Sequence, residues 1–211
     1  MEVNNLRAAL RLYAITDRHW LNADTLEHQV ELAIKGGATI IQFREKSAPD
    51  TEREALALKV QDVCRRYNVP FIINDDVELA KKINADGVHV GQEDMNILKA
   101  RAILGKNKII GVSSHNVQEA VLAQKQGADY LGCGAVFATS SKDNVSCLPL
   151  KTLKEICACV QIPVVAIGGI NLDNIELLRD TGIAGAAVIS AIFGAENIEQ
   201  AARDLRARLN N

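Results

Sequence analysis

Eight short apolar runs, each followed by a longer stretch with the apolar period of a helix, constrain the fold of this chain more than any other feature. The expected strands cover Arg11–Thr16, Thr39–Arg44, Pro70–Asn74, Gly87–Val90, Lys108–Val112, Tyr130–Gly132, Pro163–Ile167 and Gly185–Ile189. The expected helices cover Asp24–Lys35, Asp50–Tyr67, Val77–Ile83, Met95–Leu104, Val117–Gln126, Leu150–Val160, Asp173–Asp180 and Ile198–Leu209. Because a helix between two strands makes a crossover connection, we expect a parallel sheet.

Eight strand–helix units in 211 residues predict a small (β/α)8 barrel. A doubly wound open sheet is the alternative, although such sheets usually have about five or six strands. Left-handed closing residues are expected after four of the helices, at Gly36-Gly37, Gly105, Gly127 and Gly182. N-caps are expected at Asp24, Asn116 and Asn171. No Pro-rich or Ser-rich linker divides the chain, so residues 1–211 are expected to form a single domain.

The charge balance bounds the kind of partner. With 24 Lys and Arg against 26 Asp and Glu, the formal net charge is -2, which predicts neither a nucleic-acid nor a membrane partner. No apolar run approaches the roughly 20 residues that span a bilayer, and the first ten residues lack the apolar region of a secretion signal. The five cysteines are scattered without a CxxC pair, as in reduced thiols. We therefore expect a cytoplasmic protein.

A barrel of this kind gathers its binding residues at the carboxyl ends of its strands. The second strand ends in Gln42-Phe43-Arg44-Glu45-Lys46. Arg44 offers a planar fork that fits phosphate oxygens, and Lys46 adds a mobile charge. Gln42 both donates and accepts hydrogen bonds, which suits a nitrogen heterocycle. The alternative reading of this pentapeptide is a solvated strand end.

Two carboxylates, Asp75 and Asp94, follow neighbouring strands, so their side chains can approach each other. Carboxylates without histidine or thiolate partners suit a hard cation such as Mg2+, which takes one or two carboxylates plus substrate phosphate oxygens. The alternative role is helix capping, because Asp76 and Asp94 both stand just ahead of expected helices.

Two further regions predict anion binding. Gly168-Gly169 and Ile189-Ser190 follow the last two strands, where barrels frequently hold a phosphate on backbone N–H groups. Thr139, Ser141 and Lys142 bring hydroxyls and a charge to the sixth loop. The alternative for the glycines is a close-packed turn, and the alternative for the sixth loop is a solvated loop. Two anion-binding regions indicate either two phosphorylated substrates or one substrate with two phosphates.

Two histidines lie near these strand ends. His89 is expected to be a neutral core residue that faces a helix or the barrel interior. His115 lies near the rim, where it is either an acid–base group or a structural contact.

These motifs together, in order and with familiar spacing, resemble the thiamine phosphate synthase family over roughly residues 11 to 195. The segments that carry the resemblance are Leu12-Tyr13-Ala14-Ile15-Thr16-Asp17, Gln42-Phe43-Arg44-Glu45-Lys46, Asn74-Asp75, His89-Val90-Gly91-Gln92-Glu93-Asp94, Gly111-Val112-Ser113, Thr139-Ser140-Ser141-Lys142, Ile167-Gly168-Gly169-Ile170 and Ile189-Ser190. The resemblance implies a (β/α)8 barrel that joins an aminopyrimidine diphosphate to a thiazole monophosphate, with or without a carboxylate on the thiazole. The products are thiamine phosphate and pyrophosphate.

The resemblance also implies roles for individual residues. Those implied to hold the pyrimidine diphosphate are Gln42, Phe43, Arg44, Glu45, Lys46, Asn74, Ser113 and Lys142, of which Arg44, Ser113 and Lys142 are the candidates for catalysis. Those implied to hold the thiazole phosphate are Thr139, Ser141, Gly169, Ile189 and Ser190, and Ser140 is expected among the substrate-binding residues without assignment to either substrate. Asp75 and Asp94 are implied to bind one Mg2+ per active site. The partners are then two phosphorylated small molecules, and a homo-oligomer is left open.

The chain departs from the family pattern in the sixth loop, where Ala138 replaces a proline and Ser141 a threonine. Ser141 keeps the hydroxyl, whereas Ala138 removes a backbone restriction. Two rival functions belong to the same barrel class. A thiazole tautomerase would use a histidine at the position of His115 and would not need the Gln42-to-Lys46 cluster or the paired carboxylates. A non-catalytic binding barrel would lose the carboxylates or Lys142.

Overall fold

Every strand pairs in parallel with a neighbour on each side, and β1 pairs with β8 as well as with β2, so the sheet closes on itself. The computed structural model describes residues 3–21, 23–139 and 147–210. The strand order β1-β2-β3-β4-β5-β6-β7-β8 follows the chain. The expected (β/α)8 barrel is confirmed, and the open-sheet alternative is wrong.

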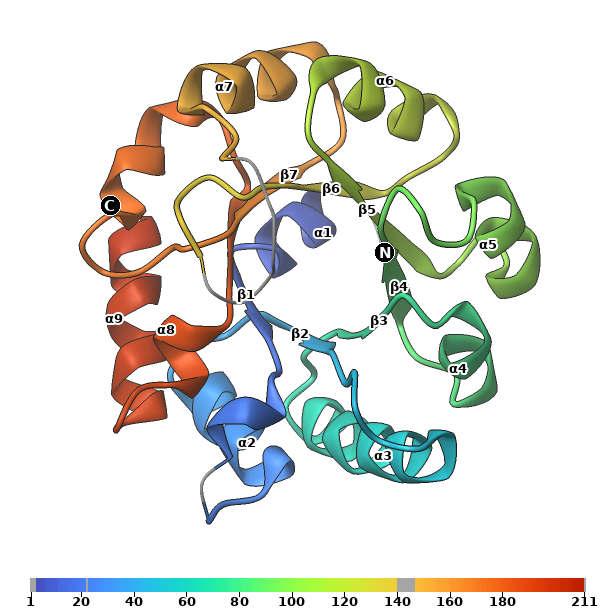
Figure 1. Cartoon of the computed structure of the whole chain (residues 1–211), viewed down its shortest axis with the longest axis vertical. Coiled ribbons are helices and arrows are strands. Elements are labelled where there is room, and N and C mark those ends of the chain that lie inside the picture. The colour runs from blue at the N-terminus through green and yellow to red at the C-terminus, as the bar shows by residue number, and fades with distance from the viewer. Residues whose placement is uncertain (1–2, 22, 140–146, 211) are drawn as a thin grey trace.

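The barrel is built from β1 (Leu12–Ile15), β2 (Ile40–Phe43), β3 (Phe71–Asn74), β4 (Gly87–Val90), β5 (Ile109–Ser114), β6 (Tyr130–Gly134), β7 (Val164–Ile167) and β8 (Gly185–Val188). The helices around it are α2 (Leu26–Lys35), α3 (Asp50–Arg66), α4 (Val77–Lys82), α5 (Ile97–Leu104), α6 (Val117–Lys125), α7 (Leu150–Cys159), α8 (Ser190–Phe193) and α9 (Ile198–Asn210), with 3-10 turns η1 (Arg18–Trp20) and η2 (Ile175–Thr181). Figure 1 shows the helices as an outer ring around the strands. None of the helices in the described ranges has the length and apolar character needed to cross a membrane.

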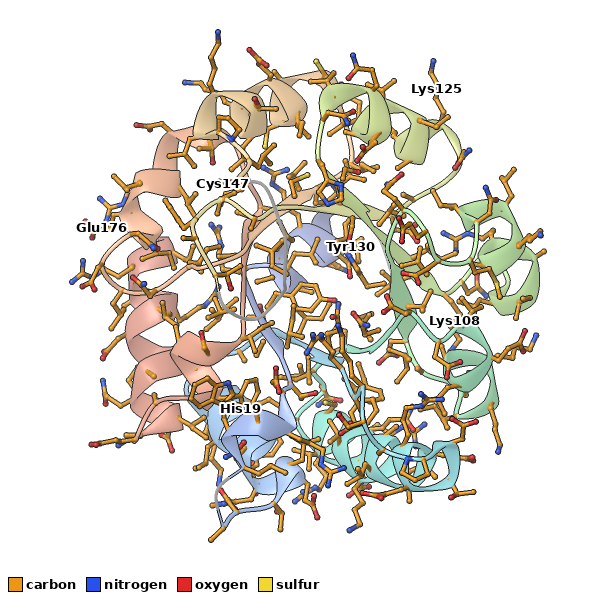
Figure 2. All side chains as sticks on the ribbon, viewed as in Figure 1. His19, Lys108, Lys125, Tyr130, Cys147 and Glu176 are labelled. Atoms are coloured by element: carbon orange, nitrogen blue, oxygen red, sulfur yellow. The ribbon has the colours of Figure 1, made fainter. Side chains whose placement is uncertain are left out.

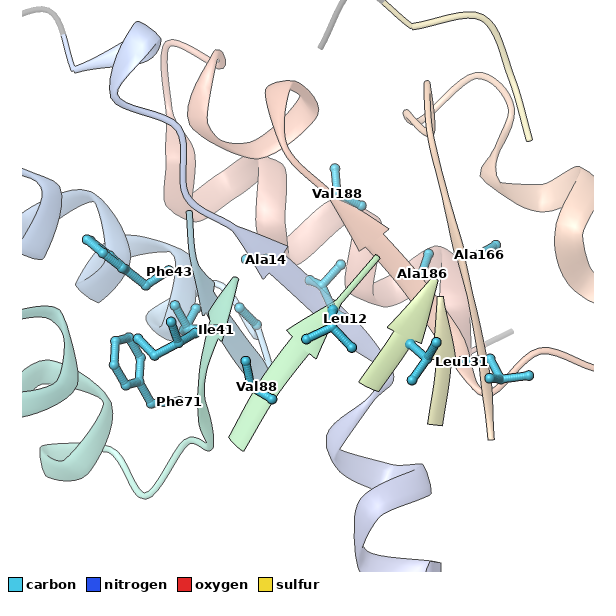
Figure 3. Close-up of a cluster of buried hydrophobic side chains, with 14 of the residues drawn as sticks. Leu12, Ala14, Ile41, Phe43, Phe71, Val88, Leu131, Ala166, Ala186 and Val188 are labelled. Carbon is cyan, nitrogen blue, oxygen red and sulfur yellow. The ribbon is translucent and has the colours of Figure 1, made fainter. Parts of the chain in front are cut away.

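Alternation along each strand divides the core into two layers. Outward-facing side chains such as Leu12, Phe43 and Val88 pack between the strands and the helices, as Figure 3 shows. Inward-facing residues form a second, smaller cluster that includes Tyr13 and Tyr130. The barrel interior is therefore filled with side chains rather than open, as expected for eight strands.

A short helix that the sequence patterns did not predict closes one end of the barrel. Helix α1 (Val3–Ala9) precedes β1, and Leu6 and Leu10 belong to the inward-facing cluster, with 5% and 0% of their surfaces exposed. Figure 1 shows α1 within the outline of the barrel. The side chain of Arg7 donates a hydrogen bond to the carbonyl of Gly182, just ahead of β8. We call this end, where the strands begin, the closed end.

Several helix ends differ from expectation. Thr25 caps α2 in place of Asp24, and Asn174 precedes η2 in place of Asn171. Asp24 and Asn171 instead accept hydrogen bonds from the backbone N–H groups of Thr25 and Asp173. The expected cap at Asn116 is confirmed. Gly37, Gly127 and Gly182 have positive φ as expected for closing residues. Gly105 also has positive φ, but its ψ of 175° lies outside the left-handed helical region, and Gly36 keeps a right-handed helical backbone.

Candidate active site

A cavity of about 190 Å³ opens at the carboxyl ends of the strands and receives residues from all eight of them. It brings together most of the residues that the sequence pointed to. These are Gln42, Arg44, Lys46, Asn74, Asp75, Asp94, Ser113, Thr139, Gly169, Ile189 and Ser190. The expectation that polar strand ends converge on one rim is therefore confirmed.

The end of β2 brings two positively charged side chains, Arg44 and Lys46, to the cavity. Arg44 is anchored at both its backbone and its side chain, because its N–H donates to Thr16 Oγ1 at 3.0 Å and its Nη1 lies 3.2 Å from Asp17 Oδ2. Its side chain is only 15% exposed, so the guanidinium is held in a defined position at the wall. Lys46 lines the same wall and is exposed.

Two members of the Gln42-to-Lys46 cluster do not line this cavity. Phe43 is 2% exposed and packs against Phe71 in the outer apolar layer, because alternation along β2 turns its side chain away from the interior. The carboxylate of Glu45 accepts hydrogen bonds from the N–H groups of Ser47 and Ala48 and so shapes its own loop. Both side chains therefore support the β2 loop behind the residues that line the cavity.

The two candidate metal ligands lie on adjacent strand ends, and both are exposed. Asp75 has a left-handed backbone, with φ of 63°, and its N–H donates to the carbonyl of His89 at 2.8 Å. An aspartate tolerates this conformation better than most residues. Asn74 donates to Asp75 Oδ2 at 2.5 Å.

Asp94 is not a helix cap, because Asn96 caps α5. Its Oδ2 instead accepts the N–H of Gly91 at 2.7 Å, which folds the loop after β4 over the strand end. Asp76, the other candidate cap, does cap α4 by accepting the N–H of Leu79 at 2.8 Å. The structure therefore confirms the capping role for Asp76 and excludes it for Asp94, whose role as a metal ligand stays a prediction.

A tight glycine turn forms the opposite wall. Gly168 and Gly169 have φ of 100° and 62°, a conformation that side chains with a Cβ rarely adopt. A Cβ on Gly169 would lie 2.2 Å from the carbonyl oxygen of Ala138, so the turn also packs closely under the sixth loop. The side chain of Asn174 donates to the carbonyl of Gly169 at 2.9 Å and secures the turn from below.

The sixth loop is described only in part. Thr139 lines the cavity, whereas Ser140, Ser141 and Lys142 lie outside the described residues. His115 also lines the cavity, and its Nδ1 lies 3.0 Å from Glu119 Oε2 on α6. Both roles considered for His115 remain compatible with this position.

The floor of the cavity holds polar residues that sequence reasoning did not assign to the site. Tyr13, Tyr130 and His89 lie in strand interiors and line the cavity. Figure 2 shows Tyr130 inside the ring of strands, whereas Lys108 and Lys125 lie toward the periphery. Burial raises the pKa of Tyr13 and of Tyr130 far above the ordinary value of a tyrosine, so both phenols keep their protons at neutral pH.

A closed parallel barrel with a polar cavity at the carboxyl ends of its strands defines the class of (β/α)8 enzymes. Comparison with known proteins narrows the class, because residues 12–192 match the family model described as thiamine monophosphate synthase. The chain therefore belongs to the thiamine monophosphate synthase family, whose members are transferases of thiamine biosynthesis.

Individual relatives agree with this family. Thiamine-phosphate synthase of Clostridium novyi is 50% identical over 196 residues, which cover 92% of this chain and 96% of that protein. The enzyme of the same name from Clostridium acetobutylicum is 47% identical over 193 residues, or 92% of each chain. The solved structure of thiamine phosphate pyrophosphorylase from Pyrococcus furiosus superposes with a TM-score of 0.89 at 43% identity, covering 97% of this chain and 98% of that one.

Proposed function

We propose that this protein joins an aminopyrimidine diphosphate to a thiazole monophosphate, giving thiamine phosphate and pyrophosphate with the help of Mg2+. The observation that carries the proposal is the distribution of charged side chains and backbone turns around the cavity. Cationic and carboxylate side chains that follow β2, β3 and β4 line the cavity together with Gly168 and Gly169 after β7 and with Ile189 and Ser190 after β8. One wall suits a diphosphate with its cation, and the other suits a monophosphate held by backbone N–H groups.

The proposal assigns each substrate to a set of residues. Gln42, Asn74 and Ser113 contact the pyrimidine ring, and Arg44 and Lys46 bind its diphosphate together with Lys142. Thr139, Gly169, Ile189 and Ser190 bind the thiazole phosphate, with Ser140 and Ser141 of the same loop. Phe43 and Glu45 support the β2 loop from behind, which agrees with their packing and hydrogen bonds.

The residues present fit a magnesium ion. Asp75 and Asp94 offer oxygen ligands from neighbouring strand ends, the donor type that Mg2+ prefers. Groups of three or more His, Cys, Asp or Glu able to hold a metal are absent from the described ranges. Two protein carboxylates leave the remaining positions to water and to the diphosphate, which is the usual arrangement for Mg2+ with a phosphorylated substrate.

The proposed reaction begins with cleavage of the C–O bond between the pyrimidine methylene and the diphosphate. The electron pair leaves with pyrophosphate, and the electron-rich aminopyrimidine delocalises the resulting cation. The thiazole nitrogen then attacks the methylene carbon and forms the new C–N bond. No covalent bond to the enzyme is required.

In this reaction the protein positions the substrates and stabilises the leaving group. Arg44, held by Thr16 and Asp17, places positive charge where pyrophosphate develops negative charge. Bound Mg2+ would add to that charge. The glycine wall aligns the thiazole with the trapped cation, which makes the second step effectively unimolecular.

The test is an assay with both substrates, with and without Mg2+, that follows thiamine phosphate and pyrophosphate separately. Stoichiometric formation of the two products, dependent on Mg2+, supports the proposal. Isomerisation of the thiazole without pyrophosphate release would identify the tautomerase, in which His115 would act. Binding of both compounds without turnover would identify a binding barrel. Running the assay with the thiazole and its carboxylated form decides between those two substrates.

A further inference from the structure

A continuous line of hydrogen bonds crosses the floor of the cavity. Gln42 Nε2 donates to the Tyr13 hydroxyl at 2.9 Å, and the hydroxyls of Tyr13 and Tyr130 lie 2.7 Å apart. The Tyr130 hydroxyl lies 3.0 Å from His89 Nδ1. The last link joins His89 Nε2 to Ser113 Oγ at 3.1 Å. Tyr13, Tyr130 and His89, which we call the relay, thus connect Gln42 on β2 to Ser113 on β5.

Two glycines make room for the relay inside the barrel. A Cβ on Gly111 would lie 2.1 Å from the ring of Tyr130, the residue that faces it across β5 and β6. A Cβ on Gly132 would lie 2.9 Å from Cε1 of His89. Neither glycine has a positive φ, so close packing against the rings, and not backbone conformation, requires them. The strands are therefore shaped around the relay.

The donors and acceptors available along this line determine which group donates in each hydrogen bond. The amide Nε2 of Gln42 can only donate, so the Tyr13 hydroxyl accepts from it and must pass its own proton to Tyr130. Tyr130 then donates to His89 Nδ1, and a neutral imidazole carries its proton on Nε2. That proton is donated to Ser113 Oγ. With the amide of Gln42 in this orientation, reversing a link leaves either a buried hydroxyl proton without an acceptor or the imidazole without its ring proton, and both are costly.

The direction decides what the two ends of the line present to a ligand. Ser113 Oγ already accepts from the relay, so its own O–H is available to donate. Oε1 of Gln42 accepts no hydrogen bond within the described ranges and is not among the buried atoms that lack a partner, so it is accessible from the cavity as an acceptor. The ends stand on β2 and β5, with β3 and β4 between them on one side of the ring.

We propose that the relay is a specificity device: it holds Gln42 as an acceptor and Ser113 as a donor, and so selects a heterocycle with an exocyclic amino group and a ring nitrogen on opposite edges. This inference rests on the proposed function, because the aminopyrimidine is the ligand with that pattern. Tyr13, Tyr130 and His89 are positioning residues that act through Gln42 and Ser113.

Removing the Tyr130 hydroxyl has a specific consequence. The proton of Tyr13 loses its acceptor, and the remaining acceptor within reach is the amide oxygen of Gln42. The amide then turns over, so that Nε2 faces the cavity and offers donors in place of the acceptor. Tyr130→Phe should therefore favour a ligand in which oxygen replaces the amino group.

The first measurement reads the direction of the line in the unmodified protein. Histidine ring 15N shifts distinguish the two neutral tautomers, and the His89 signal is assigned as the one that moves in Tyr130→Phe. Protonated Nε2 with bare Nδ1 supports the proposal. Protonated Nδ1 with bare Nε2 overturns it.

The second measurement compares two ligands by calorimetry: the aminopyrimidine diphosphate and its analogue with oxygen in place of the amino group. The unmodified protein should bind the amino compound at least about tenfold more tightly. In Tyr130→Phe this preference should fall below about twofold or reverse, with the affinity for thiazole monophosphate unchanged. Tyr67→Phe is the matched control, because Tyr67 donates to Glu31 on the outer helices, far from the cavity, and should keep the preference.

Failure of the inference and failure of the proposed function give different results. Thiamine phosphate formation with no preference between the two ligands overturns the relay as a specificity device and leaves the function standing. Equal weakening of both ligands in Tyr130→Phe reduces the relay to packing and also overturns it. An unmodified protein that binds neither pyrimidine and forms no product overturns the function and the inference with it.

Discussion

Aspartates at the two ends of the barrel have different surroundings. At the closed end, Asp86 accepts the N–H of Phe71 at 2.8 Å and Asp129 accepts the N–H of Ile110 at 2.7 Å, where strands begin. At the cavity end, Asp75 and Asp94 are exposed, and their carboxylates accept hydrogen bonds from Asn74 at the end of β3 and from Gly91 in the loop after β4. Aspartate thus ties strands together at one end of the barrel and lines the cavity of the candidate site at the other.

Other contacts extend this contrast. Arg101 donates to the carbonyls of Gly105, Lys108 and Gly127 and pairs with Asp129, so one guanidinium joins several turns at the closed end. Among the residues that the structure describes, Arg44 makes one side-chain ion pair at the cavity end, to Asp17. Charged groups of the closed end are occupied with the chain itself, as expected where stability rather than ligand binding is served.

The largest effect on stability is expected from removing a buried side chain at the closed end. Leu10 is fully buried, so Leu10→Ala should lower the free energy of unfolding by about 2–5 kcal/mol, because it leaves a cavity. Thermal unfolding measures the loss, and turnover per folded molecule should stay unchanged. Leu98→Ala, at a side chain that is 59% exposed, is the control and should cost under about 0.5 kcal/mol. Loss of turnover in a fully folded Leu10 variant would contradict the separation of the two ends.

The converse experiment removes carboxylates at the cavity end. Asp75→Ala and Asp94→Ala should each lower turnover about 100-fold or more with little change in thermal stability, because the leaving group loses its cation. Asp129→Ala is the matched control at the closed end. It should lower stability by about 1–3 kcal/mol and leave turnover near normal, since it frees a backbone N–H and Arg101. Near-normal activity of the Asp75 or Asp94 variant at low Mg2+ would show that the metal ligand is misassigned.

A third experiment tests whether the two substrates bind to different walls of the cavity. Arg44→Ala should weaken binding of the pyrimidine diphosphate about tenfold or more, because a charge-assisted contact is lost. Binding of the thiazole phosphate should change by less than about twofold, since its wall is built by β7 and β8. Separate calorimetric titrations measure both. Equal losses for the two ligands would refute the division.

The smallest effect is expected at Ala138. Ala138→Pro restores the backbone restriction common in the family and should tighten substrate binding by under about 1 kcal/mol or leave it unchanged. Binding isotherms for both substrates are the measurement. A large loss of affinity would mean that residue 138 needs a conformation that proline cannot adopt.

Much of this architecture was readable from the amino-acid pattern. All eight strands lie where apolar runs predicted them, because buried parallel strands read as short continuous runs between helical stretches. Helix α1 was missed because its seven residues carry too little periodicity, and its role depends on contacts with distant strands. The caps shifted by one to three residues where several Asx or hydroxyl side chains compete, as at Asp24 and Thr25.

The residues of the candidate site likewise include some that the sequence predicted and some that it did not. Residues on strand ends, such as Arg44 and Asp75, were predictable because the fold dictates where strand ends meet. The relay was not, since Tyr13 and Tyr130 are 117 residues apart and look like ordinary core residues. The available signal was the pair of glycines inside expected strands, at 111 and 132, because a strand glycine often marks the close approach of another group.

Helix α1, with Leu6 and Leu10, closes the barrel end where the strands begin, and this position has a consequence for the order in which the chain folds. Arg7 and Gly182, which meet at the closed end, are separated by 175 residues, and Leu6 and Leu10 share their cluster with Ala184 and Ala187. During synthesis the first helix is therefore made long before the strand that completes its burial. Bringing such distant segments together carries a large loop-closure cost. Pairing of β8 with β1 and burial of Leu6 and Leu10 should therefore occur together, late in folding. A nascent chain that stops short of β8 would leave Leu6 and Leu10 exposed to solvent. The exposure of these two leucines therefore indicates whether β8 has been added to the barrel.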